Sequence, residues 1–99
     1  MSGQGDCFEF AYNYIKDNGG TLFHAVLTNP KSDKKFWHAW VEKGDKIIDY
    51  QGQFQGNQAP RVRATWYKNW KPTRIRAYGK SQAFMAMVKN KHYGPWGAK

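Results

Sequence analysis

A chain of 99 residues supports one domain with a single modest core, which excludes two-domain arrangements and predicts one domain over residues 1–99. Its apolar content of 40%, with 17% aromatic residues, excludes a disordered chain. Sixteen Lys and Arg against seven Asp and Glu give a net charge of +9, and such a charge attracts nucleic acid, acidic polymers or anionic surfaces.

The cysteine count and the length of the apolar runs indicate the cellular compartment of the protein. Cys7 is the single cysteine, so no internal disulfide can form, and the opening residues SGQGD lack the basic and apolar pattern of a secretion signal. The apolar runs are far shorter than the roughly 20 residues that span a bilayer. We therefore expect a cytoplasmic protein with no membrane partner.

The first predicted element is a helix over residues 7–18. Asp6 suits the N-cap, and Glu9, three residues later, completes the pattern of a capping box. Apolar residues recur at helical spacing up to the glycine pair 19–20, which is a stop signal. Cys7 thus opens the predicted helix, where unpaired N–H groups and the helix dipole stabilise a thiolate.

Three strands are predicted next, and two of them form a hairpin. Gly44-Asp45 suits a two-residue turn that pairs Lys43 with Lys46. In that register His38 lies diagonal to Asp49 on one face of the sheet, which puts the imidazole and the carboxylate within reach. The three strands cover residues 21–28, 36–42 and 46–51.

The second half of the chain carries weaker signals. A turn-rich connection, 51–60, precedes a short helix over 63–70 that Pro72 ends, and an exposed strand over 73–78 follows. Ser81 is the expected cap of a last helix whose apolar stripe is formed by Phe84, Met87 and Val88. The pattern predicts an α+β domain, with a cysteine-bearing helix packed on a small antiparallel sheet and later helices.

Cys7, His38 and Asp49 form a candidate catalytic triad. His38 can take the proton of the Cys7 thiol and return it to a leaving group, and Asp49 can orient the imidazole through its other nitrogen. The Cys7 N–H and the Gln4 amide are candidate donors to an oxyanion. A lone cysteine is more often a small buried residue, so the triad rests on the placement of all three groups.

Five stretches, GDCFEFAYNYI, LFHAVLT, HAWVE, IIDY and HYGPW, together resemble a family of small phage and bacterial proteins of unknown function with a compact papain-like, transglutaminase-like cysteine hydrolase fold. The resemblance covers most of the chain in the same order, and it implies Cys7 as nucleophile, His38 as general base and acid, and Asp49 as orienting group. A phage-encoded member would act in the host cytoplasm. The sequence departs from the family pattern at Trp37, where glycine is usual, and at Tyr50, where proline is usual, which leaves the substrate open.

Other polar and aromatic residues have structural interpretations. His24 lies in a predicted strand and suits a histidine satisfied by ordinary hydrogen bonds. Trp40 either shields the ion pair of His38 and Asp49 or is a plain core residue. A zinc site would recruit Cys7, His24, His38 and Asp49, but their spacing is not that of common zinc sites, so neither a metal nor a cofactor is predicted.

Three functions stay open at this stage. The first is a thiol hydrolase or acyltransferase that acts on an amide or peptide bond of a peptide or protein substrate through an acyl-Cys7 intermediate. The second is a nucleic-acid-binding module that uses the mixed basic and aromatic stretch 61–76, RVRATWYKNWKPTRIR. The third is a catalytically inactive phage protein of the same fold that binds a host protein.

Overall fold

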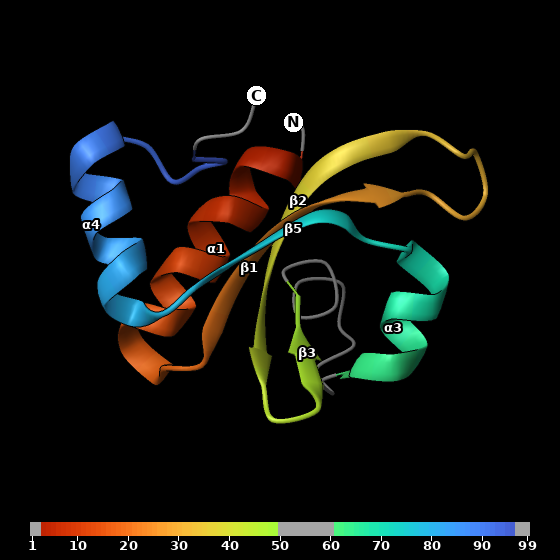
Figure 1. The fold of residues 1–99 in the computed structure, drawn as a ribbon, viewed down its shortest axis with the longest axis horizontal. Coiled ribbons are helices and arrows are strands. Elements are labelled where there is room, and N and C mark those ends of the chain that lie inside the picture. The colour runs from red at the N-terminus through yellow and green to blue at the C-terminus, as the bar shows by residue number, and fades with distance from the viewer. Residues whose placement is uncertain (1–2, 50–60, 97–99) are drawn as a thin grey trace.

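An antiparallel sheet of five strands organises the part of the chain that the computed structural model describes, which is residues 3–49 and 61–96, with side chains for 7–49 and 64–96. This arrangement confirms the predicted α+β class (Figure 1). The described elements are α1 (Gly3–Asn18), β1 (Thr21–Thr28), β2 (Lys35–Lys43), β3 (Lys46–Ile48), β4 (Arg61–Val62), α3 (Arg63–Trp70), β5 (Thr73–Tyr78) and α4 (Lys80–Asn90).

The strand order in the sheet is β4-β3-β2-β1-β5. The hairpin of β2 and β3 has the predicted turn: Lys43 pairs with Lys46, and Gly44 adopts a φ of 61°, a left-handed conformation that glycine accepts without strain. Pairing between these two strands extends only to Val41 and Ile48. Asp49 therefore follows the last residue of β3 and can turn toward His38 further along β2.

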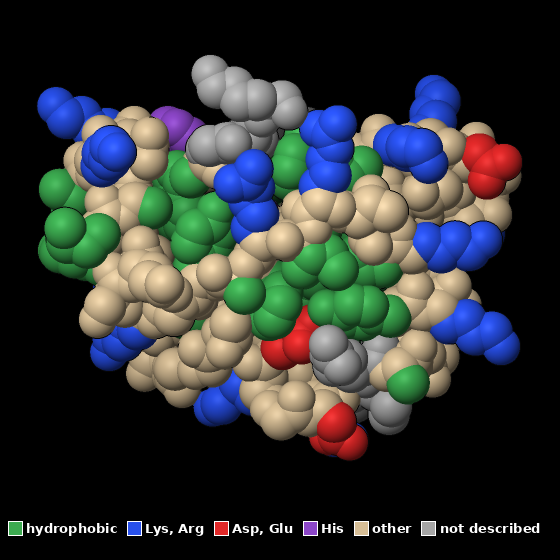
Figure 2. Space-filling model, viewed as in Figure 1, with side chains coloured by type: hydrophobic (Ala, Val, Ile, Leu, Met, Phe, Trp, Pro, Cys, Tyr) green, Lys and Arg blue, Asp and Glu red, His purple; other side chains and the backbone are tan. Residues whose placement is uncertain are grey.

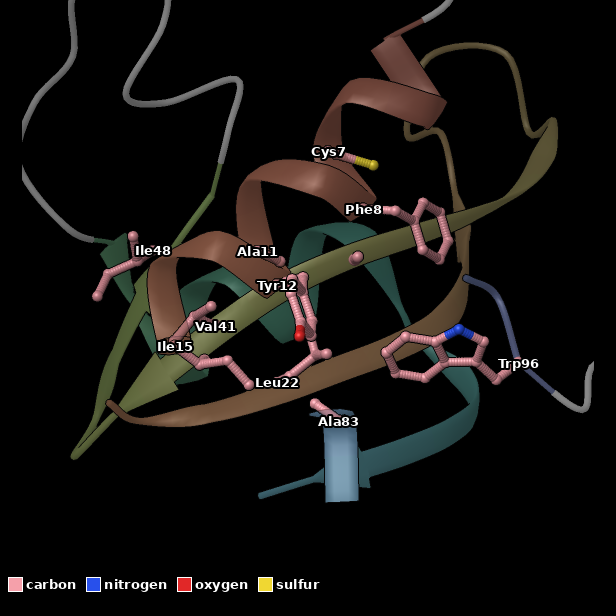
Figure 3. Packing of buried hydrophobic residues seen from close by; sticks show 11 residues of the cluster. Cys7, Phe8, Ala11, Tyr12, Ile15, Leu22, Val41, Ile48, Ala83 and Trp96 are labelled. Atoms are coloured by element: carbon pink, nitrogen blue, oxygen red, sulfur yellow. The ribbon is translucent and has the colours of Figure 1, made fainter. Parts of the chain in front are cut away.

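Helices cover both faces of the sheet (Figure 1). On one face, α1 and α4 enclose a cluster of apolar side chains with residues of β1 and β2, and Trp96 of the C-terminal segment closes its edge. Figure 3 shows Phe8, Ala11 and Ile15 of α1 among these side chains. On the other face, Trp66 of α3 packs on Trp40 with ring centroids 4.6 Å apart. Burial of apolar area on both faces is the main force that holds these layers together.

The start of α1 differs from the prediction. The helix begins at Gly3, four residues before Cys7, and Cys7 lies in its second turn. The Asp6 and Glu9 pattern is compatible with a helix interior as well as with a cap, because local propensity is a weak signal that tertiary packing overrides. The predicted end at Asn18 is confirmed, and Gly19 follows with a φ of 81°.

The last helix also differs from the prediction. Gly79, and not Ser81, precedes α4, and the Gly79 N–H donates to the side-chain oxygen of Gln82 at 2.8 Å. The small residue Ala83 is fully buried, so α4 approaches the sheet along a different face from the predicted stripe. Phe84 and Val88 are 56% and 55% exposed, while Met87 packs partly against the core.

The predicted strand over 21–28, the short helix over 63–70 and the exposed strand over 73–78 are confirmed as β1, α3 and β5. Among the described residues, β5 lies at one edge of the sheet, and its side chains from Thr73 to Ala77 are exposed. None of the helices in the described ranges combines the length and the apolar character needed to cross a bilayer.

Candidate active site

His38 of β2 and Asp49 lie in direct contact. The Nε2 atom of His38 is 3.0 Å from the Oδ1 atom of Asp49, and both side chains are largely buried. The predicted hairpin register explains this contact, because Asp49 follows Ile48, whose partner Val41 lies three residues from His38. A carboxylate that accepts from one ring nitrogen fixes the orientation of the imidazole and leaves Nδ1 for a second partner.

Cys7 is a further partner of the imidazole. The His38 ring shares a hydrogen bond with the Cys7 side chain, so the structure brings together three residues that are 11 and 31 positions apart in sequence. Cys7 is fully buried on α1 beside Phe8 (Figure 3). The helix α1 packs against β2, and Cys7 belongs to the apolar cluster that includes Ala39, the neighbour of His38 in the sequence.

The electrostatic environment keeps His38 protonated at neutral pH. Burial alone lowers the pKa of an imidazole, but the hydrogen bonds to Asp49 and Cys7, and the negative charge that each can carry, outweigh burial and raise the pKa of His38 to about 10. An imidazolium held between a carboxylate and a sulfur is in a position to donate a proton to a leaving group.

Aromatic rings hold the imidazole in place. Phe36 meets it edge-on with centroids 5.8 Å apart, and the rings of Trp40 and Trp66 lie nearly parallel to it at 6.4 and 6.5 Å. These rings restrict rotation of His38 and exclude water from one side of the ion pair. A positioned and desolvated imidazole is what proton transfer to a leaving group requires.

Glu42 is a buried residue of the site region that the sequence did not single out. Its Oε2 atom accepts from the Trp40 indole N–H at 3.0 Å and from the Tyr67 hydroxyl at 2.6 Å. The second bond ties α3 to β2 and so holds Trp40 against His38. Strand alternation is the signal that could have indicated it, because Trp40 and Glu42 lie on the same face as His38 in HAWVE.

The structure brings the triad residues together, but it does not show the predicted oxyanion donors to be available to an oxyanion. Because α1 begins at Gly3, the amide of Cys7 is the fifth in the helix and has an acceptor within the helix, so neither an unpaired Cys7 N–H nor the first turn of the helix is available to the thiolate. Trp40 is a core residue that lies against the imidazole, and its indole N–H donates to Glu42. The Gln4 side chain lies outside the described residues.

The sulfur is enclosed. Cys7 has no exposed surface and His38 is 4% exposed, so a substrate reaches the sulfur only if covering groups move aside. A hollow between α1 and α4 and another beside β5 are lined by other residues. This enclosure bears directly on function, because acyl transfer requires contact between the sulfur and a carbonyl carbon.

His24 is buried but does not have the hydrogen bonds expected of a structural histidine. Among the described residues, neither ring nitrogen has a hydrogen-bond partner. The ring is surrounded by Phe8, Tyr78 and Trp96 at centroid distances of 4.7 to 5.1 Å. Burial, with a smaller contribution from the positive charge of Arg76, lowers the pKa of His24 to about 3. The imidazole is therefore neutral and acts as a packing group.

A search of the described residues for clusters of three or more His, Cys, Asp or Glu side chains able to hold a metal ion finds none. In the comparisons with known proteins, no family model, no curated protein and no solved structure matches this chain. The geometry of Cys7, His38 and Asp49 is therefore the basis for a functional proposal.

Proposed function

We propose that this protein is a thiol hydrolase or acyltransferase that acts on an amide or peptide bond through Cys7, His38 and Asp49. The observation that carries the proposal is the position of His38, which is bonded to Asp49 at 3.0 Å and also to Cys7, with its pKa raised to about 10. A purely structural histidine does not need two partners that both stabilise its cationic form.

In the first step, the Cys7 thiolate attacks the carbonyl carbon of the substrate and a C–S bond forms. The C–N bond then breaks as the protonated His38 gives its proton to the departing amine. Asp49 keeps the ring oriented and stabilises its cationic form between steps. The product of this half-reaction is a thioester on Cys7 and a neutral imidazole.

In the second step, the neutral His38 accepts a proton from water, and the oxygen attacks the thioester carbon. The C–S bond breaks, and an acid is released with the thiolate–imidazolium pair restored. An amine in place of water gives acyl transfer instead of hydrolysis. The net charge of +9 favours substrates that carry negative charge, such as acidic peptides or peptides attached to an anionic polymer.

The burial of Cys7 favours a second candidate, in which the three residues form a structural polar network in a catalytically inactive protein that binds a host protein. A buried ion pair of this kind contributes to a unique fold without any chemistry. The two candidates differ in one measurable property, which is whether the sulfur becomes accessible in the native protein and is activated by His38.

Alkylation of Cys7 by iodoacetamide at pH 6, followed by intact mass, tests the proposal. We expect labelling of the native protein without denaturant, at a rate at least tenfold higher than in His38→Gln, because the imidazolium stabilises the thiolate. Asp49→Asn is expected to be intermediate. His92→Gln is the matched control, since His92 is exposed and its Nδ1 atom accepts from the Gly94 N–H in its own turn.

Incubation with peptide and isopeptide substrates then tests turnover. We expect cleavage products with the native protein, a mass adduct that corresponds to an acyl group on Cys7, and neither with Cys7→Ala. Equal labelling rates in the native protein and His38→Gln, or labelling only after unfolding in urea, would contradict the enzymatic proposal and support the structural network.

A further inference from the structure

A hollow of about 380 Å³ lies at one edge of the sheet, and it is lined by Trp37, Arg74, Ile75 and Arg76. Two of these four residues are cationic, two are apolar and none is acidic. The stretch Arg74–Arg76 belongs to the edge strand β5, whereas Trp37 belongs to β2, two strands away in the sheet. The site is therefore built by the fold and cannot be seen as a linear motif.

The strand register explains how Trp37 comes to face β5. Val26 of β1 pairs with Trp37 of β2 on one side and with Thr73 of β5 on the other. Strands in a sheet are about 4.8 Å apart, so the backbones of Trp37 and Thr73 are about 10 Å apart across β1. Side chains of this length meet over the intervening strand.

A β-bulge gives Arg74 an unusual direction. His24 pairs with Arg76 and Val26 pairs with Thr73, so two residues of β5, Arg74 and Ile75, lie opposite the single residue between them on β1. Arg74 adopts a φ of 54°, in the left-handed region that an arginine rarely occupies. Bulges of this kind redirect side chains and are frequent next to functional sites.

The aromatic ring of the hollow is held rigidly. Trp37 is half-buried and packs against the apolar cluster of α1, β1 and β2, while part of its ring lines the hollow. Ile75 is 46% exposed between the two arginines and adds an apolar contact. A fixed indole beside guanidinium groups is a platform on which a planar base can stack while phosphates bind the arginines.

We propose that Trp37, Arg74, Ile75 and Arg76 form a binding site for single-stranded nucleic acid. A base stacks on Trp37, and the flanking phosphates bind Arg74 and Arg76. A duplex fits less well because its bases are already stacked, and an acidic peptide matches the arginines but leaves the indole without a planar partner. The positive field of the whole chain, visible as Lys and Arg side chains around the outline of Figure 2, strengthens the attraction.

This site replaces the surface predicted from the stretch 61–76. Trp66, which belongs to that stretch, is 3% exposed and packs on Trp40, so it cannot stack on a base. The arginines of β5 remain, and the ring beside them comes from β2. None of the four residues belongs to the candidate triad, so the inference does not depend on the proposed thiol chemistry.

Fluorescence anisotropy with fluorescein-labelled dT12 tests the proposal at several salt concentrations. We expect binding that weakens as salt rises. The slope of log affinity against log salt is expected to decrease by about 1.4 in the double variant Arg74→Gln, Arg76→Gln, which is about 0.7 for each phosphate contact on a single strand. Trp37→Phe, which keeps an apolar ring in the core, is expected to weaken binding about tenfold. The matched control is the double variant Lys16→Gln, Lys46→Gln, which removes two charges near the opposite end of β1.

Circular dichroism and thermal unfolding verify that each variant is folded, and the arginine variant alters only exposed side chains. Equal affinity of the arginine variant and the lysine control would overturn the proposal, because binding would then depend on net charge alone. Polyglutamate and unlabelled dT12 are also compared as competitors at the same charge concentration. If polyglutamate competes as effectively as dT12, the proposal is overturned and an acidic protein partner is indicated.

Discussion

Gly94 lies directly against the ring of His24. A Cβ atom at position 94 would be 2.5 Å from Cε1 of His24 and 2.9 Å from Cδ2 of Phe8, and Gly94 has a φ of 123°. Both the space and the backbone conformation therefore require glycine. Through this contact the segment that ends in Trp96 closes over the apolar cluster of α1.

We expect Gly94→Ala to destabilise the protein by about 2–4 kcal/mol, because the methyl group forces the His24 or Phe8 ring to move in a packed core. Urea unfolding followed by tryptophan fluorescence measures this loss. Gly19→Ala is the control at another positive φ, 81°, where nothing lies within 4 Å of the added atom, and we expect a loss of about 1 kcal/mol. Equal losses in the two variants would contradict the close contact.

The buried imidazole of His24 makes the protein sensitive to acid. The pKa of His24 is lowered from 6.5 to about 3, so the unfolded chain binds a proton between these pH values and the folded chain does not. The contribution of His24 to stability is therefore complete above pH 6.5, and this contribution is lost as pH falls from 6.5 toward 3. We expect His24→Phe to remove this part of the acid sensitivity.

Urea unfolding of the native protein and His24→Phe at pH 7 and pH 4.5 measures the effect. The unfolding free energy of the variant relative to that of the native protein is expected to be higher at pH 4.5 than at pH 7. His92→Phe changes an exposed imidazole and is expected to leave the pH dependence unaltered. A parallel pH dependence of His24→Phe and the native protein would show that His24 is not buried in its neutral form.

Glu42 joins β2 to α3 through the Tyr67 hydroxyl and fixes Trp40 through its indole. We expect Glu42→Ala to lower the unfolding free energy by about 2–4 kcal/mol, because it leaves the buried Trp40 indole N–H and the partly buried Tyr67 hydroxyl without this acceptor. Tyr67→Phe removes one of the two bonds, and a loss of about 1–2 kcal/mol is expected in urea unfolding. Glu9→Gln, on an exposed part of α1, is expected to change stability by less than about 0.5 kcal/mol.

Local signals in the sequence were sufficient for some features of the fold. The two-residue turn at Gly44-Asp45, together with strand alternation, gave the register in which Asp49 reaches His38. This feature depends on turn geometry and periodicity, which a sequence displays directly. The meeting of Cys7 with this pair is a long-range contact, and it was expected from the residue types and the family resemblance rather than from local signals.

Features that depend on tertiary packing could not be predicted from the sequence. Which face of α4 meets the sheet is decided by the close approach at Ala83, and the stripe with Phe84 and Val88 gave the wrong face. The pairing of β5 with β1 is a long-range contact, so the neighbourhood of Trp37 and Arg74 could not be inferred. The lack of partners for His24 results from the aromatic rings that enclose it.

Because of the bonded pair of His38 and Asp49, we expect the stability of the folded protein to depend on pH in the alkaline range. The pKa of His38 is raised from 6.5 to about 10, so the folded chain holds a proton that the unfolded chain releases between these values. The stabilisation is complete below pH 6.5 and is lost as pH rises toward 10. Since the ring is almost fully buried, we expect the effect to be on the order of a few kcal/mol.

Comparison of the native protein with His38→Gln in urea unfolding at pH 6, 8 and 9.5 isolates this contribution. The unfolding free energy of the native protein relative to the variant is expected to be largest at pH 6 and to decrease steadily toward pH 9.5. His92→Gln is the matched control for the loss of a histidine side chain, because His92 is exposed. A difference between native protein and His38→Gln that stays constant over this range would mean that the imidazole is not held in its cationic form, and the thiolate–imidazolium pair would lose its basis.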